Sequence, residues 1–183
     1  MQLNWPNALT LFRIALIPVL GLCFLLPAPW MNVLAVIVFS AAAVTDWLDG
    51  YLARRLQQTS AFGAFLDPVA DKLMVAVALV ALVAVHPGPW LAVPASIIIG
   101  REIAVSALRE WMANLGARAS VAVSMAGKVK TTAQMAAIIM LLYGQSLGPI
   151  PLFELGVVLL YVAAVLTVYS MALYLRAAWE QLA

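Results

Sequence analysis

The sequence predicts an all-α integral membrane protein with six transmembrane helices and both termini in the cytoplasm. Three observations support this prediction. Hydrophobic residues make up 66% of the 183-residue chain and charged residues only 10%, against about 25% charged residues in an ordinary globular protein. The apolar residues gather in runs long enough to cross a bilayer. Lysine and arginine all fall on the predicted side that the two termini share.

The composition excludes a soluble globular protein. A 19.6 kDa chain with a mean hydropathy of +1.03 has too few polar residues to cover its surface in water. Most of its exterior must therefore face lipid. The single cysteine, Cys23, excludes a disulfide framework, a cysteine-ligated zinc ion and an iron–sulfur cluster. Without internal repeats or a long linker, we expect one membrane domain over residues 1–183.

The first two predicted spans cover residues 9–26 and 32–56. Between Arg13 and Asp46 the sequence has no ionisable residue. That stretch is too long for one span of about 20 residues and suits two helices. The segment Pro27-Ala28-Pro29 supplies the turn between them.

Two further turns divide the rest of the chain into four spans. The segment His86-Pro87-Gly88-Pro89-Trp90 combines helix breakers with a tryptophan, a residue favoured at membrane interfaces. It separates spans at 67–85 and 90–112. A Gly- and Pro-rich segment at 144–151 separates spans at 127–144 and 153–176. Gly144 and Gly148 have the spacing of a helix-contact motif, but Pro149 favours a turn.

Basic residues set the predicted orientation of the chain. The three turns on the side opposite the termini carry no lysine or arginine. Because positive residues favour the cytoplasmic side, both termini and nearly all charged residues are expected there. His86 and Glu154 lie on the opposite side. The basic residues are Arg13, Arg54, Arg55, Lys72, Arg101, Arg109, Arg118, Lys128, Lys130 and Arg176.

Four aspartates flank the connection between the second and third spans. At about 100° per residue, Asp46 and Asp49 project from one face of the second helix. Asp67 and Asp71, four residues apart, share a face if helical geometry already holds there. The short connection makes the two helices antiparallel neighbours. The sequence therefore predicts that four carboxylates converge at the cytoplasmic rim.

Such a cluster needs balancing positive charge, because close carboxylates repel strongly in a medium of low dielectric constant. An arginine, a lysine or a bound metal ion could supply it. Oxygen ligands without His or Cys favour hard divalent ions such as Mg²⁺, Mn²⁺ or Ca²⁺. Gly50 and Ala53 on the same helix face leave room for a substrate. The combination suggests metal-assisted phosphoryl transfer.

Simpler interpretations of these residues remain open. Asp67 precedes Pro68, so Asp67 could cap the third helix with Pro68 at the first helical position. A cap could still coordinate metal through its other oxygen. Arg54 and Arg55 could be cytoplasmic membrane anchors.

The aspartates belong to a longer pattern that resembles the signature of the CDP-alcohol phosphotransferase (CDP-alcohol phosphatidyltransferase) family. It consists of Asp46-x2-Asp49-Gly50-x2-Ala53-Arg54, eight residues, and Gly63-x3-Asp67-x3-Asp71. The stretches 6–13 and 101–131 are similar to the bacterial phosphatidylglycerophosphate synthase branch. They contain Pro6-Asn7-x-Leu9-Thr10-x-x-Arg13, Arg101-Glu102, Ser106-x-x-Arg109-Glu110 and Gly127-Lys128-x-Lys130-Thr131.

The resemblance implies a six-helix fold, commonly a homodimer, with a cytoplasm-facing polar cavity that holds two divalent cations, Mg²⁺ or Mn²⁺. By position, the metal ligands would be Asp46, Asp49, Asp67 and Asp71. Asp71 would also act as the general base. The cytidine diphosphate site would be lined by Gly50, Ala53, Arg54 and Gly63.

In this branch the donor is CDP-diacylglycerol, the acceptor is sn-glycerol 3-phosphate, and the products are phosphatidylglycerol phosphate and CMP. The resemblance implies a multi-pass enzyme of the bacterial cytoplasmic (inner) membrane, with membrane lipid and no nucleic acid as partner. Residues suited to bind the acceptor phosphate are Arg101, Arg109, Arg118, Lys128 and Lys130.

Each of these assignments has an alternative. The same five basic residues could anchor the chain at the membrane surface, or pair with Glu102 and Glu110. The acceptor could instead be phosphatidylglycerol, inositol phosphate or serine. A divalent-cation transporter could also use an aspartate cluster, but all four aspartates lie at one predicted rim of the membrane and not along a path across it.

Overall fold

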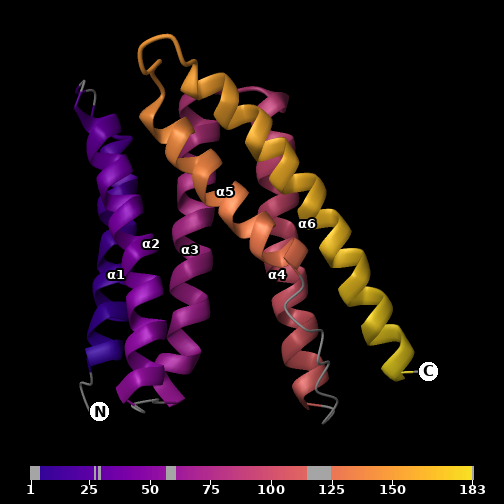
Figure 1. Ribbon diagram of the computed structural model, residues 1–183. Coiled ribbons are helices and arrows are strands. Elements are labelled where there is room, and N and C mark those ends of the chain that lie inside the picture. The colour runs from indigo at the N-terminus through magenta and orange to yellow at the C-terminus, as the bar shows by residue number, and fades with distance from the viewer. Residues whose placement is uncertain (1–4, 27, 29, 57–60, 115–124, 183) are drawn as a thin grey trace. The chain divides into compact units, whose positions relative to one another are not determined.

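The structure, a computed structural model, describes residues 5–26, 28, 30–56, 61–114 and 125–182. Over these residues it contains six α-helices and no β-strand, which confirms the all-α prediction. Each predicted span lies largely within its own helix. The helices are α1 (Trp5–Cys23), α2 (Met31–Leu56), α3 (Ala61–Val85), α4 (Pro89–Asn114), α5 (Met125–Tyr143) and α6 (Leu152–Leu182) (Figure 1).

Among the residues that the structure describes, four helices are long and apolar enough to cross a membrane. Their apolar segments are Met31–Asp49, Phe65–Val85, Pro89–Ala113 and Leu152–Arg176. The described parts of α1 and α5 hold shorter apolar segments, Asn7–Cys23 and Val129–Tyr143. Large apolar side chains such as Val80, Ile103 and Val165 are more than half exposed. This surface is suited to lipid, as expected for a multi-pass membrane protein.

The chain forms two compact units. The first comprises residues 1–85 and 142–144. In it α1 packs against both α2 and α3, and α2 also contacts α3. Helices α1 and α3 run in one direction and α2 in the other, so the start of α1, the end of α2 and the start of α3 share one end (Figure 1). Leu20, Ala35, Phe39, Ala42 and Ala78 are among its buried core residues.

The second unit comprises residues 86–141 and 145–183. Helix α4 packs along α6, and α5 closely approaches α6 at Gly156. A Cβ atom placed on Gly156 would lie 3.0 Å from Leu141 Cγ and 3.1 Å from Met140 Cβ. Glycine at this position therefore permits the close approach of the two helices.

The predicted turns around the second unit are confirmed. Helix α3 ends at Val85 and α4 begins at Pro89, with Trp90 edge-on to Phe153 at a ring-centroid distance of 5.8 Å. The segment between α5 and α6 is a turn: Gly144 and Gly148 have φ values of 69° and 60°, a left-handed conformation that favours glycine.

The interpretation of Asp67 as the N-cap of the third helix is wrong. Helix α3 begins at Ala61, so Asp67 and Pro68 lie inside it. Good helix formers such as Leu66 precede them and extend the helix backwards. Pro68 lies beyond the first turn of α3, so the helix lacks the hydrogen bond that residue 68 would donate to the carbonyl oxygen of residue 64. Its side chain is exposed.

Candidate active site

Arg13 of α1 holds two of the predicted aspartates of α2. Its Nη1 atom donates a hydrogen bond to Asp46 Oδ1 at 2.8 Å, and its Nη2 atom donates to Asp49 Oδ2. The exposed side-chain fraction is 1% for Arg13 and 5% for Asp49, but 45% for Asp46. As their helical spacing predicts, the two carboxylates reach one guanidinium group. One of them remains accessible from outside.

Thr10 extends the same arrangement to α3. It lies nearly one turn before Arg13 on α1, and its Oγ1 atom donates a hydrogen bond to Asp67 Oδ1 at 2.5 Å. Asn7, Thr10 and Arg13 recur every third residue and are all buried. Polar side chains in an apolar helix face the protein interior, where partners can satisfy them. Helix α1 therefore positions acidic residues of both neighbouring helices.

Sequence reasoning missed this role of Thr10 and Arg13. It used Arg13 for the orientation of the chain and Asn7, Thr10 and Arg13 for the family resemblance. The signal that could have revealed their role is the three-residue spacing of polar side chains in an otherwise apolar run. Such spacing places them on one side of a helix.

The remaining residues of the predicted donor site lie on α2 and α3. Asp71 follows Asp67 by about one helical turn, so both lie on one face of α3, and Asp71 is partly exposed. Gly63 is buried. Gly50, Ala53 and Arg54 belong to α2, but their surroundings lie outside the described part of the structure.

The donor atoms suit a hard divalent cation, because they are carboxylate oxygens. In the part of the chain that the structure describes, however, no three His, Cys, Asp or Glu side chains are close enough to hold one metal ion together. Arg13 and Thr10 now bind three of the four aspartates. Each of these bonds uses one carboxylate oxygen, so the other oxygen can still bind an ion, but the carboxylates would have to move closer together to share one. The ligand type fits, and Asp46 offers access.

A second polar cluster joins the three helices of the other unit. Glu102 Oε1 of α4 accepts hydrogen bonds from Arg101 Nη1 at 3.1 Å and from Lys130 Nζ of α5 at 2.6 Å. Arg101 Nη2 donates to Ser170 Oγ of α6 at 3.0 Å. Two of the five residues predicted to bind acceptor phosphate thus share one carboxylate.

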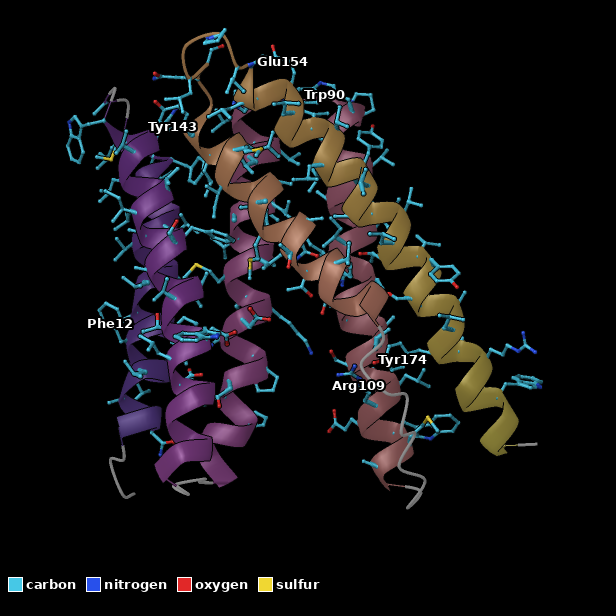
Figure 2. The ribbon with its side chains drawn as sticks, in the orientation of Figure 1. Phe12, Trp90, Arg109, Tyr143, Glu154 and Tyr174 are labelled. Atoms are coloured by element: carbon cyan, nitrogen blue, oxygen red, sulfur yellow. The ribbon has the colours of Figure 1, made fainter. Side chains whose placement is uncertain are left out.

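Arg109, a third predicted phosphate ligand, lies further along α4. Its Nη2 atom donates to Tyr174 Oη at 2.6 Å, and its Cζ atom lies 5.0 Å from the centroid of that ring. Arg101 Cζ lies 5.7 Å from the same centroid. Figure 2 shows Arg109 and Tyr174 together at the end of this unit opposite to Trp90 and Glu154. Two cations therefore meet at one aromatic ring.

The other two predicted phosphate ligands cannot be placed in the same way. Arg118 lies outside the described residues. Lys128 belongs to α5, but its side chain is outside the described part.

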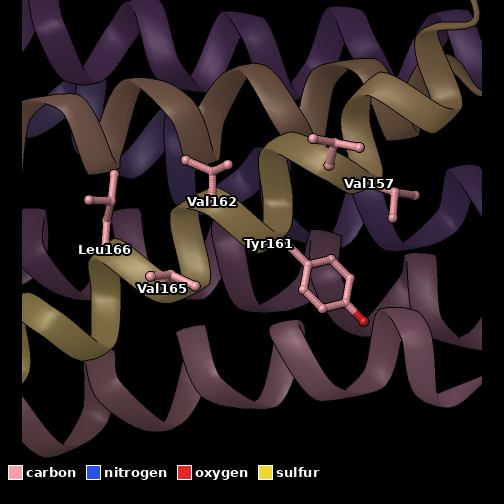
Figure 3. A pocket seen from close by; sticks show the side chains of 6 residues that line it. Val157, Tyr161, Val162, Val165 and Leu166 are labelled. Carbon is pink, nitrogen blue, oxygen red and sulfur yellow. The ribbon is translucent and has the colours of Figure 1, made fainter.

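Helix α6 also carries apolar hollows. One, of about 450 Å³, is lined by Val157, Val158, Tyr161, Val162, Val165 and Leu166 (Figure 3). Another, of about 390 Å³, lies between α4 and α6. Neither is lined by an ionisable acid or base other than tyrosine. They are suited to contact lipid chains rather than to perform acid–base chemistry.

Comparison with known proteins gives a consistent result. The family model described as CDP-alcohol phosphatidyltransferase matches residues 3–169. A protein of Pectobacterium atrosepticum is 57% identical over 183 residues, which cover 100% of this chain and 98% of that protein. A protein of Yersinia enterocolitica is 56% identical with the same coverage. A Shigella flexneri protein is 54% identical over 97% of this chain and 96% of its own length. All three are named CDP-diacylglycerol–glycerol-3-phosphate 3-phosphatidyltransferase.

Proposed function

Because the chain belongs to the CDP-alcohol phosphatidyltransferase family, we propose that it transfers the phosphatidyl group of CDP-diacylglycerol to sn-glycerol 3-phosphate. The products are phosphatidylglycerol phosphate and CMP. The observation that carries this proposal is the full-length similarity to relatives whose name states this donor and acceptor. That similarity also favours sn-glycerol 3-phosphate over the other acceptors.

The donor site is proposed at the acidic residues of α2 and α3. Asp46, Asp49, Asp67 and Asp71 would hold two divalent cations, Mg²⁺ or Mn²⁺, and the oxygen ligands support this choice. Bound cations would stabilise negative charge on the pyrophosphate and on the leaving CMP. Arg13 and Thr10 orient Asp46, Asp49 and Asp67 from α1.

The nucleotide of the donor is proposed to bind next to these acids. In the family signature, Gly50, Ala53, Arg54 and Gly63 are the corresponding positions. Three of the four residues are small, so the backbone of α2 and α3 can approach the cytidine diphosphate closely. Arg54 would pair with phosphate oxygens.

Asp71 is proposed as the general base. It would take the proton from the primary hydroxyl of the acceptor while that oxygen forms a bond to the lipid-linked phosphorus. The bond from this phosphorus to the CMP oxygen breaks in the same transfer. General-base assistance of this kind is worth about 10²–10⁴-fold in rate. The partial exposure of Asp71 is consistent with access for an acceptor.

The acceptor phosphate is proposed to bind basic residues of the second unit. Arg101 and Lys130 already meet at Glu102, and Arg109 lies further along α4. Arg118 and Lys128 complete the set by sequence. An arginine can bind phosphate through two nitrogens, whereas a lysine acts as a point charge.

We also propose that all six helices cross the bacterial inner membrane, with both termini in the cytoplasm, and that the protein forms homodimers. The distribution of basic residues supports the orientation. The four long apolar helices support the membrane location. The apolar segments of α1 and α5 are shorter, and we propose that these two helices also cross the membrane, with polar residues at their ends. The dimer rests on the family resemblance alone.

The function can be tested with the purified protein in detergent or liposomes. CDP-diacylglycerol is supplied with sn-glycerol 3-phosphate, phosphatidylglycerol, inositol phosphate or serine, with and without a chelator. We expect CMP and phosphatidylglycerol phosphate only with sn-glycerol 3-phosphate, loss of both with the chelator, and recovery on addition of Mg²⁺ or Mn²⁺. Turnover with another acceptor would change the assigned substrate. Divalent-cation flux into liposomes without CMP release would contradict the enzymatic function.

A further inference from the structure

Glu102 joins a cationic side chain of α4 to one of α5. A single oxygen atom, Oε1, accepts hydrogen bonds from Arg101 Nη1 and Lys130 Nζ. The exposed side-chain fractions are 10% for Arg101, 6% for Lys130 and 22% for Glu102. One carboxylate therefore determines where a buried guanidinium and a buried ammonium group lie relative to each other.

Arg101 is also held from α6. Its Nη2 atom donates to Ser170 Oγ at 3.0 Å, and that hydroxyl donates to the Thr167 carbonyl oxygen at 2.9 Å. The guanidinium is thus fixed by one contact on its own helix and one on α6. Its Nε atom is buried and has no hydrogen-bond partner among the described residues. Arg101 therefore retains a donor that no described residue uses.

We propose that Glu102 is a positioning residue that assembles the acceptor's phosphate site from Arg101 and Lys130. This inference rests on the proposed function. A phosphate monoester presents several oxygens at short spacing, so it binds best where two cations already lie side by side. Without the carboxylate between them, Arg101 and Lys130 would repel each other. The negative charge of Glu102 offsets this repulsion before the acceptor binds.

A purely structural role for Glu102 would have a different signature. If Glu102 only tied α4 to α5, its loss would lower the amount of folded protein and reduce the kcat without a selective change in acceptor affinity. A positioning role instead raises the KM for sn-glycerol 3-phosphate and leaves the KM for CDP-diacylglycerol nearly unchanged. The two roles are therefore separable by steady-state kinetics.

The test uses the full-length protein in detergent micelles with varied sn-glycerol 3-phosphate and saturating CDP-diacylglycerol, and then the reverse. In Glu102→Gln we expect the KM for the acceptor to rise by about tenfold or more, with the kcat and the donor KM changed by less than about twofold. Inorganic phosphate should inhibit this variant correspondingly less. Glu102→Asp keeps the charge on a shorter side chain, so its acceptor KM should lie between those of wild type and Glu102→Gln.

Glu110→Gln is the matched control, because Glu110 is an exposed glutamate of the same helix. Its kinetics should equal those of the wild type. An acceptor KM for Glu102→Gln within about twofold of wild type would overturn the positioning role. So would an equal loss of affinity for donor and acceptor. If Glu102→Gln does not fold, the acceptor KM of Glu102→Asp decides in the same way. A wild-type protein that releases no CMP with sn-glycerol 3-phosphate would instead refute the proposed function.

Discussion

Arg13 and Asp49 form a buried ion pair that joins α1 to α2. The side chains are 1% and 5% exposed, and Arg13 Nη2 donates to Asp49 Oδ2. A buried ion pair loses hydration on both sides and is stable only when further hydrogen bonds satisfy its polar atoms. Arg13 gains such a bond from its second contact, with Asp46. Helix α1 therefore helps to determine where the acidic residues of α2 lie.

Replacement of Arg13 tests this relationship. Arg13→Ala leaves Asp49 buried without its guanidinium partner, so the free energy of unfolding should fall by about 3–5 kcal/mol. Arg13→Lys keeps the charge but lacks the planar guanidinium group whose two nitrogens bind the two carboxylates. CMP release should therefore fall by about tenfold or more. Thermal unfolding in detergent and the CMP assay measure the two effects. Arg176→Ala, which replaces an exposed arginine of α6, is the control. If Arg13→Ala were as stable as the wild type, the prediction would be wrong.

Thr10 offers a test that preserves side-chain shape. Thr10→Val removes the hydroxyl that donates to Asp67 Oδ1 at 2.5 Å. A hydrogen bond to a charged group contributes about 1.5–3 kcal/mol, so the free energy of unfolding should fall by that amount. Thr10→Ser retains the hydroxyl and should lose less than Thr10→Val. Equal stability of Thr10→Val and the wild type would show that the bond contributes nothing.

Asp71→Asn separates the proposed base from donor binding. The amide cannot accept a proton from the acceptor hydroxyl, so turnover should fall by about 10²-fold or more. Binding of CDP-diacylglycerol that depends on Mg²⁺ or Mn²⁺ should persist, because the amide oxygen can still bind a cation beside the three remaining carboxylates. It is measured by equilibrium binding of the radiolabelled donor. Asp49→Ala is the comparison: it removes the oxygen ligand altogether, so both turnover and metal-dependent donor binding should be lost. Near-normal turnover of Asp71→Asn would exclude Asp71 as the base.

Gly156 tests the contact between α5 and α6. A side chain there would meet Leu141, Met140 and the Ala137 carbonyl oxygen within 3.0–3.2 Å. Gly156→Leu should therefore lower the free energy of unfolding by about 1–3 kcal/mol through overpacking. Gly21 of α1 has no atom within 4 Å of the corresponding Cβ position, so Gly21→Leu is the matched control. Equal melting temperatures of the two variants would contradict the close approach.

The helices could be predicted well from the sequence, because each apolar run is bounded by prolines, glycines or charges. The start of α3 could not. Asp67-Pro68 has the local pattern of a helix start, yet the chain is already helical from Ala61. Local preference there is weaker than continuation of a helix that packs against α1. Helix spacing also predicted that Asp46 and Asp49 would project together, and Arg13 contacts both.

The partners of the acidic and basic residues were harder to predict. Arg13 contacts aspartates 33 and 36 residues away, and Lys130 contacts Glu102 over 28 residues. Such contacts depend on how helices pack, which the spacing within one helix does not specify. Charge alone predicted Arg101 and Lys130 as candidate anion ligands and left pairing with Glu102 open. It could not show that one carboxylate oxygen holds them both.

Pro68 lies between Asp67 and Asp71 in α3. Because proline has no backbone N–H, the carbonyl group four residues earlier receives no intrahelical hydrogen bond from it. The turn at residues 64–68 therefore bends more easily than the neighbouring turns, because it has one hydrogen bond fewer to break. Helix α3 thus has a compliant joint at residues 64–68, so the first turns of the helix, which hold Gly63, can tilt while the turn from Asp67 to Asp71 keeps its own hydrogen bonds and stays rigid.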